Sequence, residues 1–243
     1  MTNKPVWVII PAAGVGRRMQ ADCPKQYLSL HDKTVLEHTL DIFLGNAGIS
    51  GIVVVTGAED EYWPVIAEKL QGFPVYQTVG GKERADSVLN GLNYLSARDV
   101  PADAAILVHD AARPCLSFQD LHLLLAAVDT CADSGAVLAT PVRDTMKRGK
   151  SGQHPAFIQH TESRENLWHA LTPQLARLGI LQQALSKALA EGAEITDEAS
   201  ALEFIGLHPR LLEGGSSNIK ITRPADLALA EFFLQQRLAE EEN

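Results

Sequence analysis

The clearest indication of the fold lies in Val6-Trp-Val-Ile-Ile-Pro-Ala-Ala-Gly-Val-Gly-Arg-Arg-Met-Gln20, which Pro24-Lys-Gln26 follows after a short gap. An apolar run ends at a proline and enters a turn of small residues, and cations come directly afterwards. Glycines let a backbone approach a ligand closely, and consecutive N–H groups at such a turn bind anions. The whole chain carries a formal net charge of -9. A local cluster of cations in so acidic a chain predicts a phosphate site.

The length and composition predict one large α/β domain. The chain has 243 residues, of which 46% are hydrophobic and 21% are charged, enough to bury a sizeable core. No Pro/Gly/Ser-rich linker divides it, so we expect a single domain over residues 1–243. The acidic balance disfavours a nucleic-acid partner, which would need a basic face. It permits a cationic pocket for a small anion.

The cysteines and the hydropathy pattern give an expectation for where in the cell the protein is found. Cys23, Cys115 and Cys131 are widely spaced and form no Cys-x-x-Cys pair, so we expect unreactive thiols rather than zinc ligands. The apolar run Val6–Ile10 is far too short to span a membrane, and no basic region precedes a long apolar segment. We therefore expect a cytoplasmic protein with no membrane partner.

Apolar runs and helical patterns alternate along the chain. Short runs bounded by turn residues predict buried strands, and apolar residues at helical spacing predict helices. The strands expected are Val6–Ile10, Gly51–Thr56, Phe73–Gln77, Ala104–Val108, Ala136–Ala139 and Leu207–Leu212, and the helices are Thr34–Leu44, Glu59–Leu70, Ala85–Leu95, Phe118–Thr130, Pro173–Ala190, Glu198–Phe204 and Arg223–Arg237. This alternation predicts an α/β fold with a Rossmann-like, mostly parallel sheet between helices.

The alternation breaks at Pro141. From Val142 to Arg164 the chain is polar and basic, with a turn-like Gly149-Lys-Ser-Gly152. The segment is too polar for a core and too long for an ordinary connection. We expect a projecting β-arm over about 142–164 that packs on a partner subunit; the alternative is a mobile surface loop.

The turn after the first strand is the first candidate site. Its backbone is expected at the carboxyl end of a parallel sheet, where open α/β sheets bind ligands. It lacks the Gly-Lys-Ser/Thr ending of a Walker loop and the third glycine of a dinucleotide fingerprint. Phosphate binding is favoured over a purely structural turn. The candidate nucleotide-binding residues here are Pro11, Ala12, Ala13, Gly14, Gly16 and Arg18.

Lys25 lies just beyond this turn, in Cys-Pro-Lys-Gln-Tyr. A lone lysine is usually a solvated surface charge, but one placed here can act at a phosphoryl centre. Phosphoryl and nucleotidyl transfer need positioning and charge neutralisation more than covalent help. Lys25 would supply a compact charge, and Arg18 could grip two oxygens at once.

A second candidate site lies in Gly80-Gly-Lys-Glu-Arg-Ala-Asp-Ser-Val88. A Gly-Gly turn enters a helix whose N-terminus can bind a polar ligand. Gly81, Lys82 and Ser87 are candidates for contacts with a nucleotide base. Simple capping of the helix is an equally good interpretation of this stretch.

A third candidate lies in Val108-His-Asp-Ala-Ala-Arg-Pro114. A buried strand that ends in His-Asp places a carboxylate at the ligand edge of the sheet, where it can hold a hydroxyl or a Mg²⁺ ion. Arg113 can grip a second anion. The alternative is a structural Asp110–Arg113 pair.

Further candidates are dispersed along the chain. Each would alone be taken as an ordinary surface or capping residue, and spacing cannot show whether they share a site. They are Thr145, Arg164, Thr172, Thr196 and Lys220, of which Arg164 and Lys220 are also candidate catalytic residues beside Arg18 and Lys25.

In combination, these motifs resemble the 2-C-methyl-D-erythritol 4-phosphate cytidylyltransferase family. The resemblance is carried by Pro11-Ala-Ala-Gly-Val-Gly-Arg-Arg-Met, Pro24-Lys-Gln-Tyr, Gly81-x-x-Arg-x-x-Ser-Val, Val108-His-Asp-Ala-Ala-Arg-Pro, Pro141-Val-x-Asp-Thr-Met-Lys and Thr196-Asp-Glu-Ala-Ser. It runs from about Val6 to the final helix. It implies a nucleotidyltransferase-type fold and transfer of CMP from CTP to methylerythritol phosphate, with Mg²⁺, in isoprenoid precursor synthesis.

The resemblance also implies residue roles. Arg18 and Lys25 would stabilise charge on the α-phosphate, and the substrate's own phosphate would be the nucleophile. Backbone of Ala12–Gly14 would contact the nucleotide, and Gly81 and Ser87 would help to recognise cytosine; Lys82 stands where an acidic or polar residue is expected near the base. Asp110, Arg113, Thr145 and Lys220 would hold methylerythritol phosphate. The arm would swap across a two-fold homodimer, so that Arg164, with Thr172 and Thr196, completes a shared site.

Without the resemblance, the residues themselves predict only a Mg²⁺-dependent nucleotidyltransferase that uses a small anionic co-substrate. One alternative is an enzyme for another sugar or polyol phosphate. A Rossmann oxidoreductase is disfavoured, because its second strand should close on an acidic residue and this one ends Val55-Thr-Gly57. A third alternative is a non-catalytic protein that binds CTP without turnover.

Overall fold

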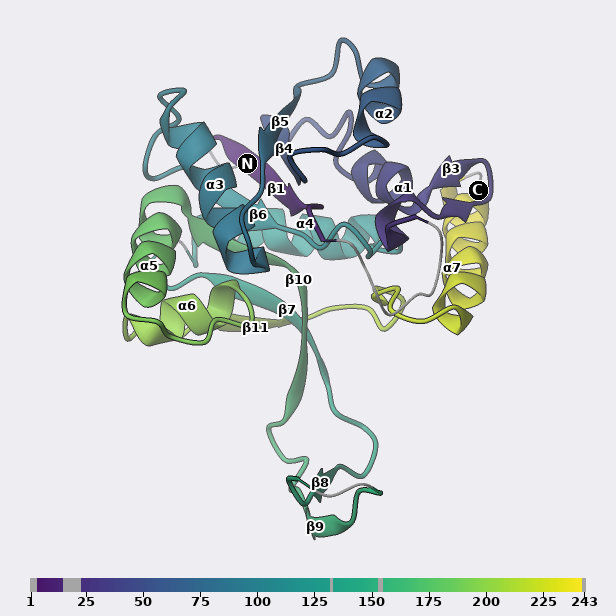
Figure 1. The fold of residues 1–243 in the computed structure, drawn as a ribbon, viewed down its shortest axis with the longest axis vertical. Coiled ribbons are helices and arrows are strands. Elements are labelled where there is room, and N and C mark those ends of the chain that lie inside the picture. The colour runs from purple at the N-terminus through teal and green to yellow at the C-terminus, as the bar shows by residue number, and fades with distance from the viewer. Residues whose placement is uncertain (1–3, 15–22, 132, 153–154, 242–243) are drawn as a thin grey trace.

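The chain folds around a central seven-stranded sheet in a computed structural model that describes residues 4–14, 23–131, 133–152 and 155–241 (Figure 1). The strand order is β11 (Arg210–Glu213), β7 (Ala136–Pro141), β10 (Trp168–Arg177), β6 (Ala105–Val108), β1 (Val6–Pro11), β4 (Gly51–Thr56) and β5 (Val75–Val79). β10 runs antiparallel to both of its neighbours, and the other pairs in the sheet are parallel. The predicted mostly parallel α/β fold is confirmed.

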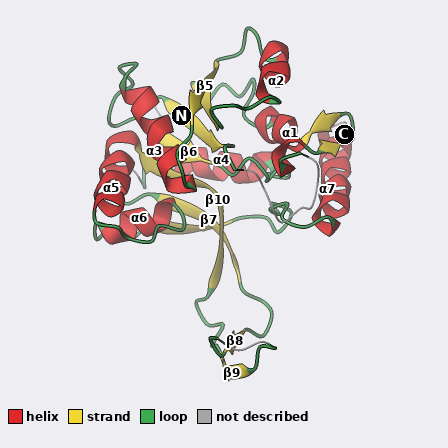
Figure 2. Cartoon of the chain, in the orientation of Figure 1, coloured by secondary structure: helices red, strands yellow, loops and turns green. Residues whose placement is uncertain are grey.

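Helices surround the sheet, as Figure 2 shows in red around the yellow strands. They are α1 (Val35–Asp41), α2 (Trp63–Lys69), α3 (Arg84–Ser96), α4 (Phe118–Ala127), α5 (Leu178–Ala190), α6 (Glu198–Phe204) and α7 (Ala225–Glu241), with a 3₁₀ helix, η2, at Lys25–Tyr27. Two short antiparallel pairs complete the described elements: β2 (Ser29–Leu30) with β3 (Lys33–Thr34), and β8 (Lys147–Gly149) with β9 (Ile158–Thr161).

The alternation of side chains along β1 divides the core into two layers. Val8 and Ile10 face one layer, which α1, α2 and α4 cover. Ile9 faces the other, which α3, α5 and α6 cover. Successive side chains of a strand point to opposite faces, so the continuous apolar run of β1 fills both layers. That is why the first strand can lie in the middle of the sheet.

The chain reverses its direction of travel across the sheet next to β1. It proceeds from β1 to β4 and β5 on one side, and α3 then returns it to β6 on the other side of β1. In open α/β sheets the crevice outside the carboxyl ends of two such strands is where ligands bind. The fold therefore brings the turn after β1 and the His109-Asp110 segment after β6 together at this point.

The arm expected at about 142–164 projects from the body of the molecule (Figure 1). β7 and β10 extend beyond the sheet, and the β8–β9 hairpin lies at their far end. Every described residue from Lys147 to Thr161 is exposed, Phe157 and Ile158 included. The hairpin thus has no core of its own within this chain.

The predicted start of the helix at Pro173–Ala190 is wrong. The stretch Pro173–Ala190 starts as the last part of β10, and the helix begins only at Leu178. Gln174 to Arg177 pair antiparallel with β6, from Val108 back to Ala105. A short apolar run such as Leu175-Ala176 is compatible with the helical and with the strand period. Here the run forms a strand, because it is buried beside β6 and hydrogen-bonds with it.

Other boundaries differ by a few residues. The helix expected from Glu59 begins at Trp63, the strand expected from Leu207 begins at Arg210, and the strand expected from Phe73 begins at Val75. All three cysteines are free, with Cys115 and Cys131 buried. Within the described part of the chain, no helix has the length and apolar character needed to cross a bilayer.

Candidate functional site

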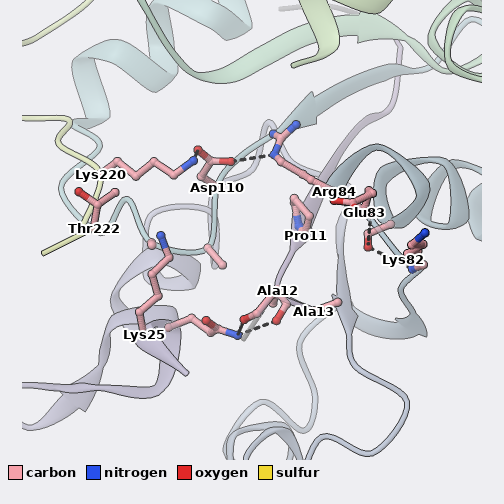
Figure 3. A pocket seen from close by; sticks show the side chains of 16 residues that line it. Pro11, Ala12, Ala13, Lys25, Lys82, Glu83, Arg84, Asp110, Lys220 and Thr222 are labelled. Carbon is pink, nitrogen blue, oxygen red and sulfur yellow. Dashed lines mark hydrogen bonds and ion pairs between the residues drawn. The ribbon is translucent and has the colours of Figure 1, made fainter. Parts of the chain in front are cut away.

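A cavity of about 360 Å³ opens at the carboxyl ends of β1 and β6 (Figure 3). It is lined by Pro11, Ala12, Ala13, Gly14, Lys25, Gln26, Gly81, Lys82, Glu83, Arg84, Ser87, Asp110, Ala111, Ala112, Lys220 and Thr222. Four of these side chains are cationic and two are carboxylates. The cavity therefore gathers positive charge in a chain whose net charge is -9.

The turn after β1 is held by its neighbours on both sides. The Ala12 N–H donates to the Val55 carbonyl of β4 over 2.7 Å. The buried Gln26 amide Nε2 donates to the carbonyls of Ala12 and Gly14 at 2.7 and 3.0 Å. Since the carbonyls are occupied by Gln26, Ala12–Gly14 have a fixed course along the cavity wall. Gly16 and Arg18, the remaining candidates of this turn, lie outside the described residues.

Lys25 reaches from the other wall of the cavity (Figure 3). Its Nζ donates to the Ile221 carbonyl at 3.0 Å. This contact joins η2 to the segment before α7, which carries Lys220 and Thr222. Two lysines from opposite ends of the sequence therefore line the same cavity.

The Gly-Gly turn serves both as a helix cap and as cavity lining. The buried Ser87 hydroxyl donates to the Glu83 carbonyl and accepts from the Gly81 N–H, each over 3.1 Å. Glu83 and Asp86 form a capping box at the start of α3. A Cβ on Gly80 would lie only 2.6 Å from the Ala13 Cβ, so a glycine is needed where this turn meets the turn after β1. The two interpretations of this motif are thus compatible.

Asp110 is the buried carboxylate around which the cations on one side of the cavity gather. Its Oδ1 lies 3.1 Å from Arg84 Nε, and its Oδ2 lies 2.7 Å from Lys220 Nζ and 3.5 Å from Arg113 Nε. Burial opposes ionisation of this carboxyl, but the three cations outweigh it and hold its pKa well below the usual range. Asp110 is therefore a fixed negative charge within a positive pocket.

Arg113 supports Asp110 from beneath the cavity. Its side chain is buried, and its NH1 donates to the Asn218 carbonyl at 2.7 Å. Asn218 in turn donates from Nδ2 to the Thr172 carbonyl at 2.7 Å. Arg113 thus forms the structural pair with Asp110 that was the alternative interpretation, and it is absent from the described lining of the cavity.

Thr172 is also beneath the cavity, in a network with His109. The Asp110 N–H donates to the Thr172 hydroxyl at 3.0 Å. His109 Nε2 lies 3.0 Å from the Arg113 carbonyl, which can only accept, so Nε2 carries the proton. His109 Nδ1 then accepts from the Thr172 hydroxyl at 3.0 Å. Thr172 is buried, and this network uses its hydroxyl to orient Asp110.

Three other candidates lie elsewhere in the described chain. Thr145 and Arg164 belong to the arm, where Arg164 donates to the Arg143 carbonyl. Thr196 is exposed and its N–H donates to the Ser200 hydroxyl at 3.1 Å, just before α6. Within one chain, the described cavity includes none of these three residues.

Sequence reasoning did not assign a role to Arg84. Its guanidinium lines the cavity and joins Asp110 to Glu198, with NH1 2.6 Å and NH2 3.1 Å from the two Glu198 oxygens. Burial lowers the pKa of Arg84, but Glu198 and Asp110 outweigh it and raise that pKa. The sequence showed only that Arg84 is a cation just after a Gly-Gly turn. Its two partners, Asp110 and Glu198, are distant in sequence.

The arrangement can hold a polyanion. Backbone of the turn after β1 and of the Gly-Gly turn lines one side, and Lys25, Lys82 and Lys220 supply charge around it. Neutralising and positioning phosphates is most of what phosphoryl and nucleotidyl transfer require from a protein. The fixed carboxylate of Asp110 adds an acceptor for hydroxyl groups.

Comparisons with known proteins all point to the same protein family. Residues 6–236 match the family model of 2-C-methyl-D-erythritol 4-phosphate cytidylyltransferase (IspD). A relative of that name from Vibrio vulnificus (strain CMCP6) is 52% identical over 230 residues, covering 94% of each chain. A crystal structure of a 4-diphosphocytidyl-2C-methyl-D-erythritol synthase superposes with a TM-score of 0.82 at 38% identity, over 96% of this chain and 100% of that one. The Francisella tularensis cytidylyltransferase structure gives 0.79 at 35% identity, over 94% and 99%.

The buried His109 makes stability depend on pH. Burial lowers its pKa from 6.5 to about 4, so as the pH falls below about 6.5 the unfolded chain takes up a proton that the folded one resists. Stability should be complete above that pH and decline toward pH 4. Between pH 7 and pH 5 we expect His109 to cost about 2 kcal/mol of unfolding free energy.

Denaturant unfolding of the wild type and of His109→Gln at both pH values measures this effect. The wild type should lose about 2 kcal/mol more than the variant on going to the lower pH, because the other titrating groups are common to both. Equal losses of unfolding free energy in the two proteins would contradict the conclusion that His109 causes the pH dependence.

Proposed function

This chain belongs to the 2-C-methyl-D-erythritol 4-phosphate cytidylyltransferase family, and we propose that its cavity transfers CMP from CTP to 2-C-methyl-D-erythritol 4-phosphate. The products are 4-diphosphocytidyl-2-C-methyl-D-erythritol and pyrophosphate. The observation that carries the proposal is the meeting, at one switch point, of the turn after β1 with Lys25, Asp110 and Lys220. The reaction belongs to isoprenoid precursor synthesis, as the family assignment indicates.

The nucleotide is assigned to the side formed by β1 and α3. Backbone of Ala12–Gly14 would follow the phosphates, and Gly81 and Ser87 would contact cytosine near Lys82. Support comes from the buried Ser87 hydroxyl, whose two hydrogen bonds fix the Gly-Gly turn against Ala13. A rigid turn suits selection of a base by backbone groups.

Chemistry would take place between the two sides. A phosphate oxygen of the acceptor attacks the α-phosphorus of CTP, a new P–O bond forms, and the bond to the pyrophosphate oxygen breaks. The acceptor phosphate is already ionised, so no protein base has to remove a proton. Lys25 would stabilise the charge that develops on the α-phosphate. Arg18 is predicted to act beside it.

The acceptor is assigned to Asp110 and Lys220. The carboxylate would accept from the acceptor's hydroxyl groups, and Lys220 Nζ, 2.7 Å from Asp110, would attract its phosphate. Arg113 and Thr172, beneath the cavity, would hold Asp110 in place rather than touch the acceptor. This assignment gives each half of the cavity one substrate.

A Mg²⁺ requirement is part of the proposal. Among the described residues no three His, Cys, Asp or Glu side chains gather in a way that could hold a metal. Mg²⁺ commonly keeps several waters and binds through substrate phosphates, so the donor set fits an ion that is carried by the triphosphate of CTP. When bound, it would neutralise charge on the leaving pyrophosphate.

A homodimer is also part of the proposal. The hairpin, whose described residues are all exposed, Phe157 and Ile158 among them, would pack on a second copy, since a two-stranded arm without a core gains stability only by such packing. Arg164 of one chain, with Thr145, would then complete the acceptor side of its neighbour's cavity. Thr196, next to α6, would contribute there as well.

Pyrophosphate release with a panel of nucleoside triphosphates and sugar or polyol phosphates tests the activity. We expect turnover with CTP and 2-C-methyl-D-erythritol 4-phosphate, abolished by EDTA and restored by Mg²⁺. EDTA should leave the melting temperature of the protein without substrates unchanged, because the proposal assigns the ion to the triphosphate of CTP and the described residues contain no cluster of ligands for it. Faster turnover with another acceptor would favour the broader sugar-phosphate alternative, and CTP binding without turnover would favour a non-catalytic protein.

Lys25→Ala should reduce kcat far more than affinity for CTP. Loss of one group that stabilises developing charge costs about 3 kcal/mol in the barrier, or roughly a hundredfold in rate. Steady-state kinetics and calorimetry with CTP separate the two effects. The matched control is Lys187→Ala, on the exposed face of α5. Near-normal kcat with weak CTP binding would instead make Lys25 a ground-state ligand.

Arg164 is expected to act across subunits. Arg164→Ala and Lys25→Ala should each be strongly impaired alone, but mixing them should restore up to about a quarter of wild-type activity, since each mixed dimer has one intact shared site. Subunit exchange can be followed with two different tags. Full exchange with no recovered activity would argue against the swapped arm.

A further inference from the structure

Glu198 is a buried carboxylate to which the roles above give no function. It is the first residue of α6, and its side chain is 2% exposed. Burial raises the pKa of its carboxyl, and Arg84 opposes that effect. Its negative charge therefore depends on the guanidinium beside it, because a buried charge without a partner is strongly disfavoured.

The contact with Arg84 is bidentate and leaves one donor for Asp110. NH1 and NH2 of Arg84 meet the two oxygens of Glu198 at 2.6 and 3.1 Å, while Nε donates to Asp110 Oδ1 at 3.1 Å. The guanidinium is rigid and planar, so fixing two nitrogens also fixes the direction of the third. Glu198 thus determines where Arg84 points its Nε.

The position of Glu198 is itself secured by β10. Asp197 caps α6 by accepting from the Ser200 N–H at 2.9 Å. Gln174 of β10 donates to Asp197 Oδ2 and accepts from the Ala199 N–H, each over 2.9 Å. β10 pairs with β6, the strand that leads to Asp110. The carboxylates at the two ends of Arg84 are therefore held by adjacent strands.

The orientation of Asp110 follows from these contacts. Arg84 holds Oδ1 and Lys220 holds Oδ2, on opposite sides of the carboxylate (Figure 3). Without a charge at position 198 the bidentate ion pair is lost, because a neutral amide offers the guanidinium only one oxygen, and Arg84 can turn toward an incoming phosphate. Asp110 would then keep its charge but lose one of the three cations that orient it.

We propose that Glu198 is a positioning residue for the acceptor, acting through Arg84 on the carboxylate of Asp110. The inference rests on the proposed contact between Asp110 and the acceptor. It assigns Arg84, although it lines the cavity, to Asp110 rather than to the triphosphate. Changes at Glu198 should therefore affect the acceptor and spare CTP.

Steady-state kinetics of Glu198→Gln, with each substrate varied in turn, tests this. We expect the KM for 2-C-methyl-D-erythritol 4-phosphate to rise about tenfold or more, as for the loss of a hydrogen bond between charged groups, while the KM for CTP stays within about twofold. Glu198→Asp should recover part of the loss, because it restores the charge. Glu203→Gln, at an exposed position on the same helix, is the matched control and should behave as wild type.

A double-mutant cycle shows whether the effect passes through Asp110. In an Asp110→Asn background, Glu198→Gln should cause little further loss in acceptor affinity. Fully additive losses, an unchanged acceptor KM, or parallel rises for both substrates would each overturn the proposal. If Glu198→Gln fails to fold, Arg84→Lys provides the test: it keeps the charge but loses the bidentate contact, and a rise confined to CTP would refute the role.

A wild-type protein that shows no turnover with these substrates contradicts the proposed function itself. A wild type that turns over normally, with Glu198→Gln indistinguishable from it, contradicts only the role of Glu198. Calorimetric titration of the acceptor onto the protein bound to a CTP analogue that cannot release pyrophosphate gives the same distinction without relying on rates.

Discussion

The ionised carboxylate of Asp110 is the constraint on which the side of the cavity next to Lys220 depends. It is buried, so it can keep its charge only while cations surround it. Those cations come from α3, from the segment after β6 and from the segment before α7. One desolvated charge therefore brings three separate parts of the chain together, and any shift of one of them changes the environment of the others.

The side of the cavity formed by the turn after β1 and the Gly-Gly turn depends first on backbone contacts. The turn after β1 is fixed by the amide of Gln26 and by the neighbouring strand β4, and it meets the Gly-Gly turn at a contact too close for a side chain. Rigid backbone and lysine side chains are complementary in such a site, because the first supplies direction and the second supplies charge.

The electrostatic organisation also reconciles an acidic protein with an anionic substrate. Surface charge is screened within about a Debye length, whereas the groups around Asp110 lie in a partly desolvated cleft where each interaction is stronger. Local cations therefore outweigh the net charge of -9 at the site. The exposed arm lies outside this cluster, and its apolar side chains fit the proposed packing on a second copy.

Sequence alone determined the mostly parallel sheet, the turn at the end of β1, the arm and the family, because apolar periodicity and short motifs are local properties. It placed Asp110 and Ser87 correctly at the cavity but mistook the end of β10 for helix, since a short apolar run fits either period. The bridge from Glu198 through Arg84 to Asp110, and the buried positions of Arg113 and Thr172, came only from the tertiary structure. The physical reason is that the groups satisfying a buried charge are chosen by proximity in space, and residues 84, 110 and 198 become neighbours only when the sheet has formed.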